Sequence, residues 1–191
     1  LFGCGLIDFA GSTVVHMTGG VAAFWGAFFL GPRQARGGRN ARKMDPLPPN
    51  YAPPYGPIFQ TLGTLILWMG WYGFNGVSTL YLVNYGLVAA KTMVTTTIAA
   101  GTGGVTTLFL GAIVSPRNVD TGGMVLSLGH ATNGVLAGLV AITAPCSTCE
   151  PYGAFIIGFL ASPVYLGAHG LLEMMGIDDV VSAIPVHGFC G

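Results

Sequence analysis

The chain has 191 residues, of which 52% are hydrophobic and only 7% are charged, and its formal net charge is zero. Soluble domains carry roughly 25% charged residues, so this chain has too few to cover the surface of a soluble protein. With no excess of basic residues to neutralise phosphates, the composition also excludes a nucleic-acid binder. A mean hydropathy of +0.66 agrees with an all-α polytopic membrane protein.

A membrane-spanning helix needs about 20 mostly apolar residues. Five stretches meet this requirement and a sixth begins near the end of the chain, at residues 6–31, 58–81, 89–114, 124–144, 151–172 and 180–191. We expect these helices to form a single transmembrane domain over residues 1–191. Because the first residue is Leu1 and the sixth stretch is cut short, we interpret the chain as a fragment of a longer protein.

Positive charge predicts which ends of the helices face inward. The connection at residues 32–57 holds five of the seven cationic side chains, namely Arg33, Arg36, Arg39, Arg42 and Lys43. Short loops rich in Lys and Arg stay on the cytoplasmic side, so we expect 32–57 to be a cytoplasmic loop. The first helix then runs inward and the directions alternate. Arg117 falls in the next inward loop, whereas Lys91 falls at an outward end and is the exception.

Two of the spans share the pattern Asp-x7-His, with Asp8 and His16 in the first and Asp179 and His187 in the last. The two helices enter from opposite faces of the membrane. Eight residues at 1.5 Å each would place each histidine about 12 Å beyond its aspartate, near the midplane of a hydrocarbon core roughly 30 Å thick. Inverted repeats that deliver polar groups to the midplane are typical of transporters.

A metal site is the weaker explanation of these histidines. Two histidines without a third ligand nearby are poor evidence for zinc. The outward Cys146 and Cys149 form an isolated CxxC motif that would need two further ligands, although a disulfide between them is conceivable. The sequence therefore predicts neither a metal nor another cofactor.

Proton handling fits the histidine pair better. An imidazole can donate a hydrogen bond from one nitrogen and accept at the other near neutral pH. No nucleophile lies beside a general base, which argues against a hydrolase. A purely structural pair that ties two helices together is the alternative, and the repeated spacing favours function over it.

An aromatic cluster occupies residues 67–76, with the sequence LWMGWYGFNG, near the outward end of the second predicted span. Such residues fit an interfacial belt. They also fit a cage for a cation. Composition alone favours the belt.

The remaining polar residues of the spans have structural interpretations. We expect His130 and His169, near inward helix ends, to be packing or interfacial residues. Asn75 and Asn133 can form hydrogen bonds across helices.

These motifs resemble those of the ammonium transporter family, which includes the methylammonium permeases and Rhesus proteins. Its signature begins with Asp, an aromatic residue, Ala and Gly and closes with Arg, as do residues 8–33 here, DFAGSTVVHMTGGVAAFWGAFFLGPR. Shorter segments that are similar to the plant-type branch occur at 70–75, 141–144, 150–151 and 186–188. The resemblance covers nearly the whole chain. It implies a fragment of an eleven-helix fold with an inverted repeat, from the fifth helix to the start of the tenth.

The resemblance assigns roles along a conduction path. His16 and His187 match the paired pore histidines that share a hydrogen bond. Phe74 matches one of two stacked phenylalanines that gate the pore, and Trp71 matches a tryptophan of the pore wall.

The resemblance also implies an outer ammonium site. Ser78 matches the serine of that site, and Asp8 matches an aspartate that supports it without touching the ion. The second gate phenylalanine and the outer tryptophan belong to earlier helices of the family. Ser182 stands where the family often has an acidic residue.

The resemblance implies an ammonium transporter or channel, not an enzyme. Ammonium would be recruited outside and ammonia conducted past the paired histidines, with or without a separately moved proton. The alternative is an ammonium sensor of the same fold with little or no transport. The expected partners are ammonium or methylammonium as substrate, the lipid bilayer and two further copies in a homotrimer. We expect a multi-pass protein of the plasma membrane.

Overall fold

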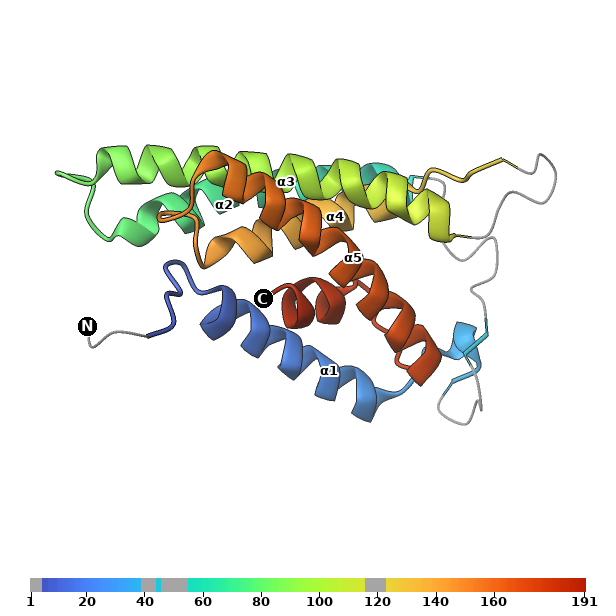
Figure 1. Cartoon of the computed structure of the whole chain (residues 1–191). Helices are drawn as coiled ribbons and strands as arrows, with labels where there is room; N and C mark the ends of the chain where they lie inside the picture. The colour runs from blue at the N-terminus through green and yellow to red at the C-terminus, as the bar shows by residue number, and fades with distance from the viewer. Residues whose placement is uncertain (1–4, 39–43, 46–54, 116–122) are drawn as a thin grey trace.

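The computed structural model describes residues 5–38, 44–45, 55–115 and 123–191, and its regular elements are all helices (Figure 1). In chain order these are η1 (Ser12–Met17), α1 (Thr18–Leu30), η2 (Gln34–Arg36), α2 (Gly56–Gly76), η3 (Val77–Thr79), α3 (Gly86–Val114), α4 (Leu128–Thr143), α5 (Pro151–Met175) and η4 (Ile184–Phe189). The sequence expectations for Arg39, Arg42, Lys43 and Arg117 lie outside the described residues.

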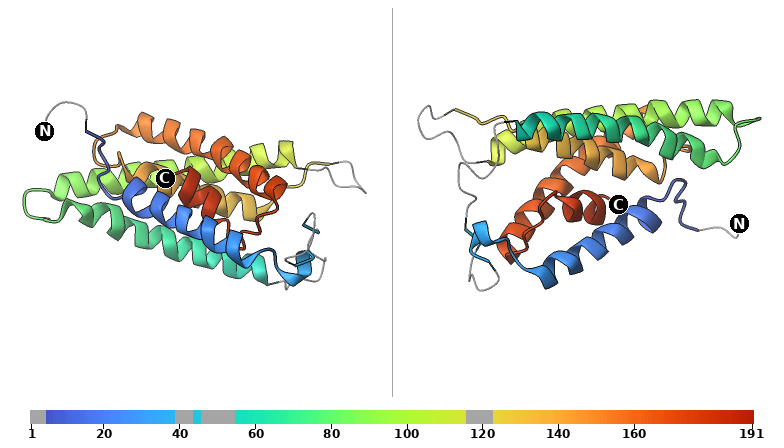
Figure 2. Two further views of the ribbon diagram at one scale, coloured as in Figure 1. Left: turned by 90° about the horizontal axis from the view of Figure 1, so that it is seen from below. Right: turned by 180° about the vertical axis from the view of Figure 1, so that it is seen from behind.

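The helices form a group of four around α3, with a second unit at its side. α3 packs against α2, α4 and α5. η4 lies between α1 and α5, so α1 is joined to the rest of the bundle largely through η4 (Figures 1 and 2). The two elements with the Asp-x7-His pattern, η1 and η4, pack against each other.

Three helical stretches among the described residues are long and apolar enough to cross a membrane, namely Ser12–Leu30, Gly86–Val114 and Pro151–Met175. The helix at Leu128–Ile142 is apolar but shorter. α2 has 21 residues, which at 1.5 Å per residue span about 30 Å. The division of the chain into membrane spans, and the side that each end faces, stay predictions.

Small residues let α3 approach its neighbours closely. A Cβ atom on Gly103 would collide with the backbone of Gly134 on α4, and one on Gly158 of α5 would collide with Ala99. Thr107 of α3 packs directly over Gly134. Helices in lipid associate mainly through such close van der Waals packing, and here it builds the rigid frame on which the central elements rest.

Each Asp-x7-His aspartate lies before its helix and caps it. Asp8 Oδ2 accepts from the backbone N–H groups of Thr13 and Val14 at 3.1 and 2.9 Å. Asp179 Oδ2 accepts from Ile184 N at 2.6 Å. Carboxylates at such positions satisfy N–H groups that have no partner within the helix. The expectation that each aspartate lies within its helix, 12 Å of helical rise from its histidine, is therefore wrong.

The same entrance geometry recurs in both halves. The residue three positions after each aspartate has positive φ, with Gly11 at 93° and Ser182 at 56°. After this turn both elements begin as π-helical segments, η1 and η4. π-helical turns are rare and occur frequently at functional sites. The Asp-x7-His repeat in the sequence thus corresponds to one helix-start geometry that occurs twice, at η1 and at η4.

The two elements cross at glycines in a nearly two-fold arrangement. Gly20, four positions after His16, contacts Gly188, which directly follows His187. In the same way Gly191, four positions after His187, contacts Met17, which directly follows His16. A Cβ on Gly20 would collide with the Gly188 backbone, and a Cβ on Gly191 would lie 2.9 Å from Met17 N. Only glycine permits this approach at both contacts.

An ion pair ties the segment after α1 to the segment before η4. Arg33 Nε and Nη2 donate to the two carboxylate oxygens of Asp178 at 2.6 and 2.7 Å, and Arg33 N donates to Asp178 Oδ2 at 2.9 Å. The Asp178 side chain is 2% exposed. These hydrogen bonds from Arg33 hold the pKa of Asp178 below its ordinary value of 3.8. Arg36 pairs with the exposed Glu173 at 2.9 Å.

The turn between α4 and α5 explains the exceptional lysine. Lys91 Nζ lies 2.6 Å from Glu150 Oε1, so its charge is paired. Cys146 and Cys149 in this turn are both free thiols in the structure. Burial raises the pKa of Cys146 to about 12, and its Sγ donates to Thr143 O. A thiol with so high a pKa is a poor nucleophile.

The glycine crossing gives a first prediction. We expect Gly20→Ala in the purified full-length protein to lower the free energy of unfolding by about 1–3 kcal/mol, because the methyl group must push the two backbones apart. Thermal unfolding in detergent measures this. The neighbouring Gly19 is the matched control, since a Cβ there would meet nothing within 4 Å and Gly19→Ala should cost nothing. Equal melting temperatures for the two variants would refute the close crossing.

The ion pair gives a second prediction. We expect Asp178→Asn to lower the free energy of unfolding by about 1–3 kcal/mol at neutral pH, since Arg33 loses a charged acceptor. Because the pKa of Asp178 is lowered by folding, this stabilisation is present above the ordinary pKa and is lost as the pH falls from about 5 toward 2.

The wild-type protein should therefore lose more stability than the Asp178→Asn variant in thermal melts over that acidic range. Glu173→Gln is the control, because its exposed pair with Arg36 is worth at most about 1 kcal/mol. Parallel melting curves for wild type and Asp178→Asn would contradict the prediction.

Candidate functional site

The structure brings His16 of η1 and His187 of η4 into direct contact. Their Nδ1 atoms are 3.2 Å apart, and the ring centroids are separated by 5.1 Å with 26° between the planes. The glycine crossing described above produces this contact. Each histidine lies one helical turn before a crossing glycine, Gly20 for His16 and Gly191 for His187.

The Nδ1–Nδ1 contact restricts where the pair can carry protons. A hydrogen bond between two ring nitrogens needs one donor and one acceptor, so in a neutral pair one Nδ1 is protonated and the other is not. The Nε2 atoms then have opposite roles, since the ring that donates at Nδ1 accepts at Nε2 and its partner donates there. The pair thus offers one donor and one acceptor to a molecule that passes it.

Two aromatic rings of α2 surround His16. The Trp71 ring stacks on it with centroids 5.0 Å apart and 17° between the planes. The Phe74 ring lies 5.4 Å from it and 5.9 Å from Trp71. Trp71 is only 7% exposed. For Trp71 the interfacial belt that composition favoured is therefore wrong, because its ring is buried against the histidine.

A cavity of about 180 Å³ lies beside this stack, lined by His16, Leu67, Gly70, Trp71 and Phe74. The Nε2 atom of His16 is buried and has no hydrogen-bond partner among the described residues. A buried polar atom without a partner is costly, and such atoms require an explanation. A small hydrogen-bonding molecule in this apolar cavity would supply the missing partner.

A second cavity, of about 420 Å³, lies toward the start of α2 and is more polar. Gln60, Thr64, Asn133 and Ser182 are among its lining residues. Leu67 lines both cavities. One face of α2 carries residues that follow one another at spacings of three or four, namely Gln60, Thr64, Leu67, Trp71 and Phe74. Along this face the side chains change from an amide and a hydroxyl, through a leucine, to two aromatic rings.

The two residues expected at an outer site lie beyond Phe74 and His16. Ser78, in η3, follows Phe74 by one turn and donates from Oγ to the Phe74 carbonyl at 2.6 Å. Asp8 caps η1 with one oxygen, while its Oδ1 is buried without a partner among the described residues. Neither residue lines the cavity beside His16.

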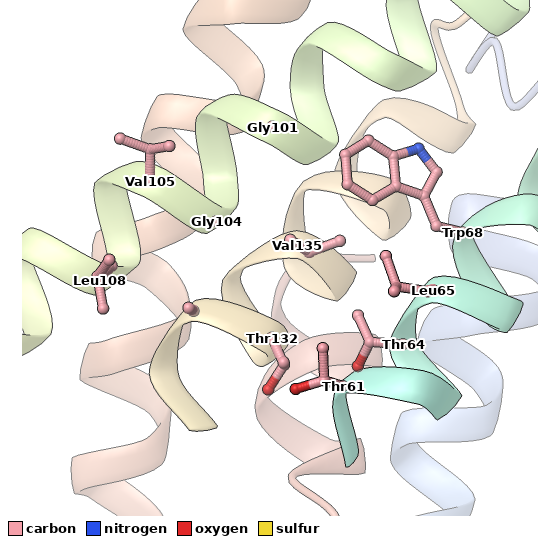
Figure 3. Close-up of a pocket in the computed structure, with 11 residues that line it drawn as sticks. Thr61, Thr64, Leu65, Trp68, Gly101, Gly104, Val105, Leu108, Thr132 and Val135 are labelled. Carbon is pink, nitrogen blue, oxygen red and sulfur yellow. The ribbon is translucent and has the colours of Figure 1, made fainter. Parts of the chain in front are cut away.

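A third cavity, of about 300 Å³, lies between α2, α3 and α4 (Figure 3). Thr61, Thr64 and Thr132 gather at one end and Trp68 lies at the other (Figure 3). Neither His16 nor His187 lines it. This apolar hollow is thus separate from the histidine pair.

Three further polar residues singled out in the sequence, Asn75, Asn133 and His169, have structural partners. Asn75 Nδ2 donates to Thr96 Oγ1 and Asn133 Nδ2 donates to the Tyr165 hydroxyl, both at 2.9 Å, which confirms the expected bonds across helices. His169 stacks on Tyr165, with ring centroids 5.9 Å apart. Within the described part of the chain, no three His, Cys, Asp or Glu side chains gather as a metal site.

Some residues of the site were not anticipated from the sequence. Leu67 and Gly70 carry no distinctive chemistry, although their helical spacing to Trp71 and Phe74 is a signal that could have identified them. Gly20 follows His16 by four residues, but nothing in the sequence says which backbone it meets.

The chain matches the description "Ammonium Transporter Family" over residues 2–191. It is 41% identical over 201 residues to "Ammonium transporter 1 member 1" of Solanum lycopersicum, with 100% of this chain and 38% of the relative covered. It is 40% identical over 191 residues to "Ammonium transporter Amt2" of Archaeoglobus fulgidus, with 99% and 37% covered.

Solved structures agree. The structure of a protein named "Sensor Amt Protein" is similar with a TM-score of 0.82 at 34% identity, covering 97% of this chain and 42% of its own. The structure of Candida albicans Mep2 is similar with a TM-score of 0.75 at 30% identity, covering 97% and 37%. The chain spans about two fifths of the length of the relatives it matches.

Proposed function

Because this chain belongs to the ammonium transporter family, we propose that it forms part of a path that moves ammonium across a membrane. The observation that supports this best is the contact between His16 and His187 beside an apolar, aromatic-lined cavity. The apolar helices and the family make it a membrane protein. The multi-pass arrangement, the plasma membrane as its location and a homotrimer in the bilayer belong to this proposal.

The energetics of the path favour ammonia over the bare cation at its centre. A charged group at the middle of a bilayer costs at least about 2.5–3.5 kcal/mol. The cavity beside His16 offers aromatic and aliphatic surface and no carboxylate among its lining residues. Loss of the proton before this cavity would remove the charge, and the neutral molecule would then pass the histidine pair. The net transported species depends on whether that proton follows by a separate route.

The histidine pair suits a neutral molecule that both donates and accepts hydrogen bonds. Ammonia has N–H donors and one lone pair, and the pair presents one acceptor and one donor Nε2. The buried Nε2 of His16, which has no partner among the described residues, is suited to this role. Trp71 forms the wall against which His16 is held, and Phe74 closes the cavity on its Ser78 side.

Recruitment of the cation belongs to the outer end. Ser78 supplies a hydroxyl one turn beyond Phe74, and ring faces attract a cation by about 0.5–2 kcal/mol. Asp8 contributes a negative field without contact, because one of its oxygens is committed to capping η1. Ammonium and methylammonium are the proposed substrates. The chemistry proposed here is transport and not an enzymatic reaction.

An ammonium sensor is the second candidate, since one structural neighbour has the name "Sensor Amt Protein". A sensor would bind ammonium and pass a signal with little or no flux. Transport assays separate the two candidates.

We expect labelled methylammonium uptake and ammonium-evoked current in cells that express the full-length protein. His187→Ala and His16→Ala should each change the rate or the ammonium-to-methylammonium selectivity by roughly tenfold, because the remaining imidazole loses its buried partner. His169→Ala is the control, since that histidine packs on Tyr165 away from the pair.

Each outcome has a definite interpretation. Uptake without current would indicate net ammonia conduction. Binding without uptake or current, with the protein at the cell surface, would favour the sensor. Unchanged rate and selectivity after replacement of both histidines would refute their role in the path.

A further inference from the structure

The outer end of α4 holds both members of the aromatic–histidine stack. Thr143, in the last turn of α4, is fully buried. Its hydroxyl accepts a hydrogen bond from Trp71 Nε1 at 2.9 Å and donates to Leu139 O at 2.7 Å. Because the Thr143 hydroxyl donates its proton to Leu139 O, the direction of the oxygen lone pairs is fixed. The indole N–H of Trp71 must point along that direction to donate to Thr143 Oγ1.

The same helix end anchors the chain that carries His16. Phe9 N donates to Ala144 O at 3.0 Å, and Ala10 N donates to Thr143 O at 3.2 Å. The Ser12 hydroxyl donates to Val140 O at 2.7 Å. The last carbonyls of a helix have no partner within it, and here those of Val140, Thr143 and Ala144 accept from residues in and just before the start of η1.

From these contacts we propose that Thr143 is a positioning residue for the histidine pair. Through its hydroxyl it sets the plane of Trp71, which stacks on His16 at 5.0 Å and 17°. The ring plane of His16 in turn aims its Nδ1 at His187, 3.2 Å away. The role in transport rests on the proposed function, while the hydrogen bond itself does not.

The surroundings make the hydroxyl hard to replace. Trp71 packs in a cluster with buried Ala100, Ala137, Val140 and Tyr165, and the Tyr165 hydroxyl already accepts a hydrogen bond from Asn133. An indole has one donor, and a buried donor without a partner is destabilising. Without Thr143 Oγ1, the ring must either leave its N–H unpaired or turn away from His16.

The chain offers isosteric variants and a matched control. Thr143→Val removes the hydroxyl and keeps the shape, and Thr143→Ser keeps the hydroxyl. Thr107→Val is the control, because Thr107 is equally buried on α3 and its hydroxyl has no partner among the described residues. Trp71→Phe provides a background in which an aromatic ring remains but the N–H is absent.

The experiment is a double-mutant cycle on the full-length protein, with Thr143→Val and Trp71→Phe alone and together, read by thermal unfolding in detergent and by methylammonium uptake. We expect Thr143→Val to lower uptake by about tenfold in the wild-type background and by less than about twofold in the Trp71→Phe background. Thr143→Ser should restore uptake to within about twofold of wild type, and Thr107→Val should retain it.

The outcomes distinguish this inference from the proposed function. Additive effects on melting temperature would show that the hydrogen bond is absent, and the inference would fall. Coupled melting temperatures with uptake unaffected by Thr143→Val would make the bond purely structural, which also overturns the positioning role. A wild-type protein at the cell surface with neither uptake nor current would refute the proposed function itself, and the positioning role with it.

Discussion

The crossing of η1 and η4 is the contact on which the rest of the structure depends. Two short helical elements, each started by an aspartate cap and a residue of positive φ, approach closely enough that only glycine fits between them. That approach is what brings two imidazole nitrogens to 3.2 Å. The remaining helices can be understood as a scaffold: α4 and α5 hold the crossing from one side, and α2 places its aromatic face against it.

Some polar groups inside this apolar bundle make two hydrogen bonds each, as Ser12 and Thr143 do. The end of α4 near Thr143 shares backbone hydrogen bonds with the segment before His16 and, through one threonine, orients the tryptophan that stacks on that histidine. At the opposite end, Arg33 and Asp178 close the connection between α1 and the start of η4. Because unsatisfied polar groups are costly in lipid, these bonds help to fix the geometry of the site.

Composition predicted the helical class, and the repeated spacing indicated that His16 and His187 lie at a similar depth. The resemblance to the family implied that the two histidines share a hydrogen bond. The sequence misplaced both aspartates. An Asp-x7-His spacing is the same whether the aspartate lies inside the helix or caps it from the preceding turn. Composition also suggested a belt for Trp71, because an aromatic residue near a helix end says nothing about which way its ring turns. Thr143 was beyond prediction: it lies 72 positions from Trp71 in the chain, and only tertiary structure brings such residues together.

The near two-fold relation of the two histidines has a consequence for the proton they share. In a strictly symmetric pair the two tautomers, with the proton on one Nδ1 or the other, would be equal in energy. Among the described residues Trp71 stacks on His16 and no counterpart stacks on His187, so the two rings have different surroundings and the degeneracy is lifted. The pair is therefore a biased two-state element, in which the shared proton favours one Nδ1 over the other.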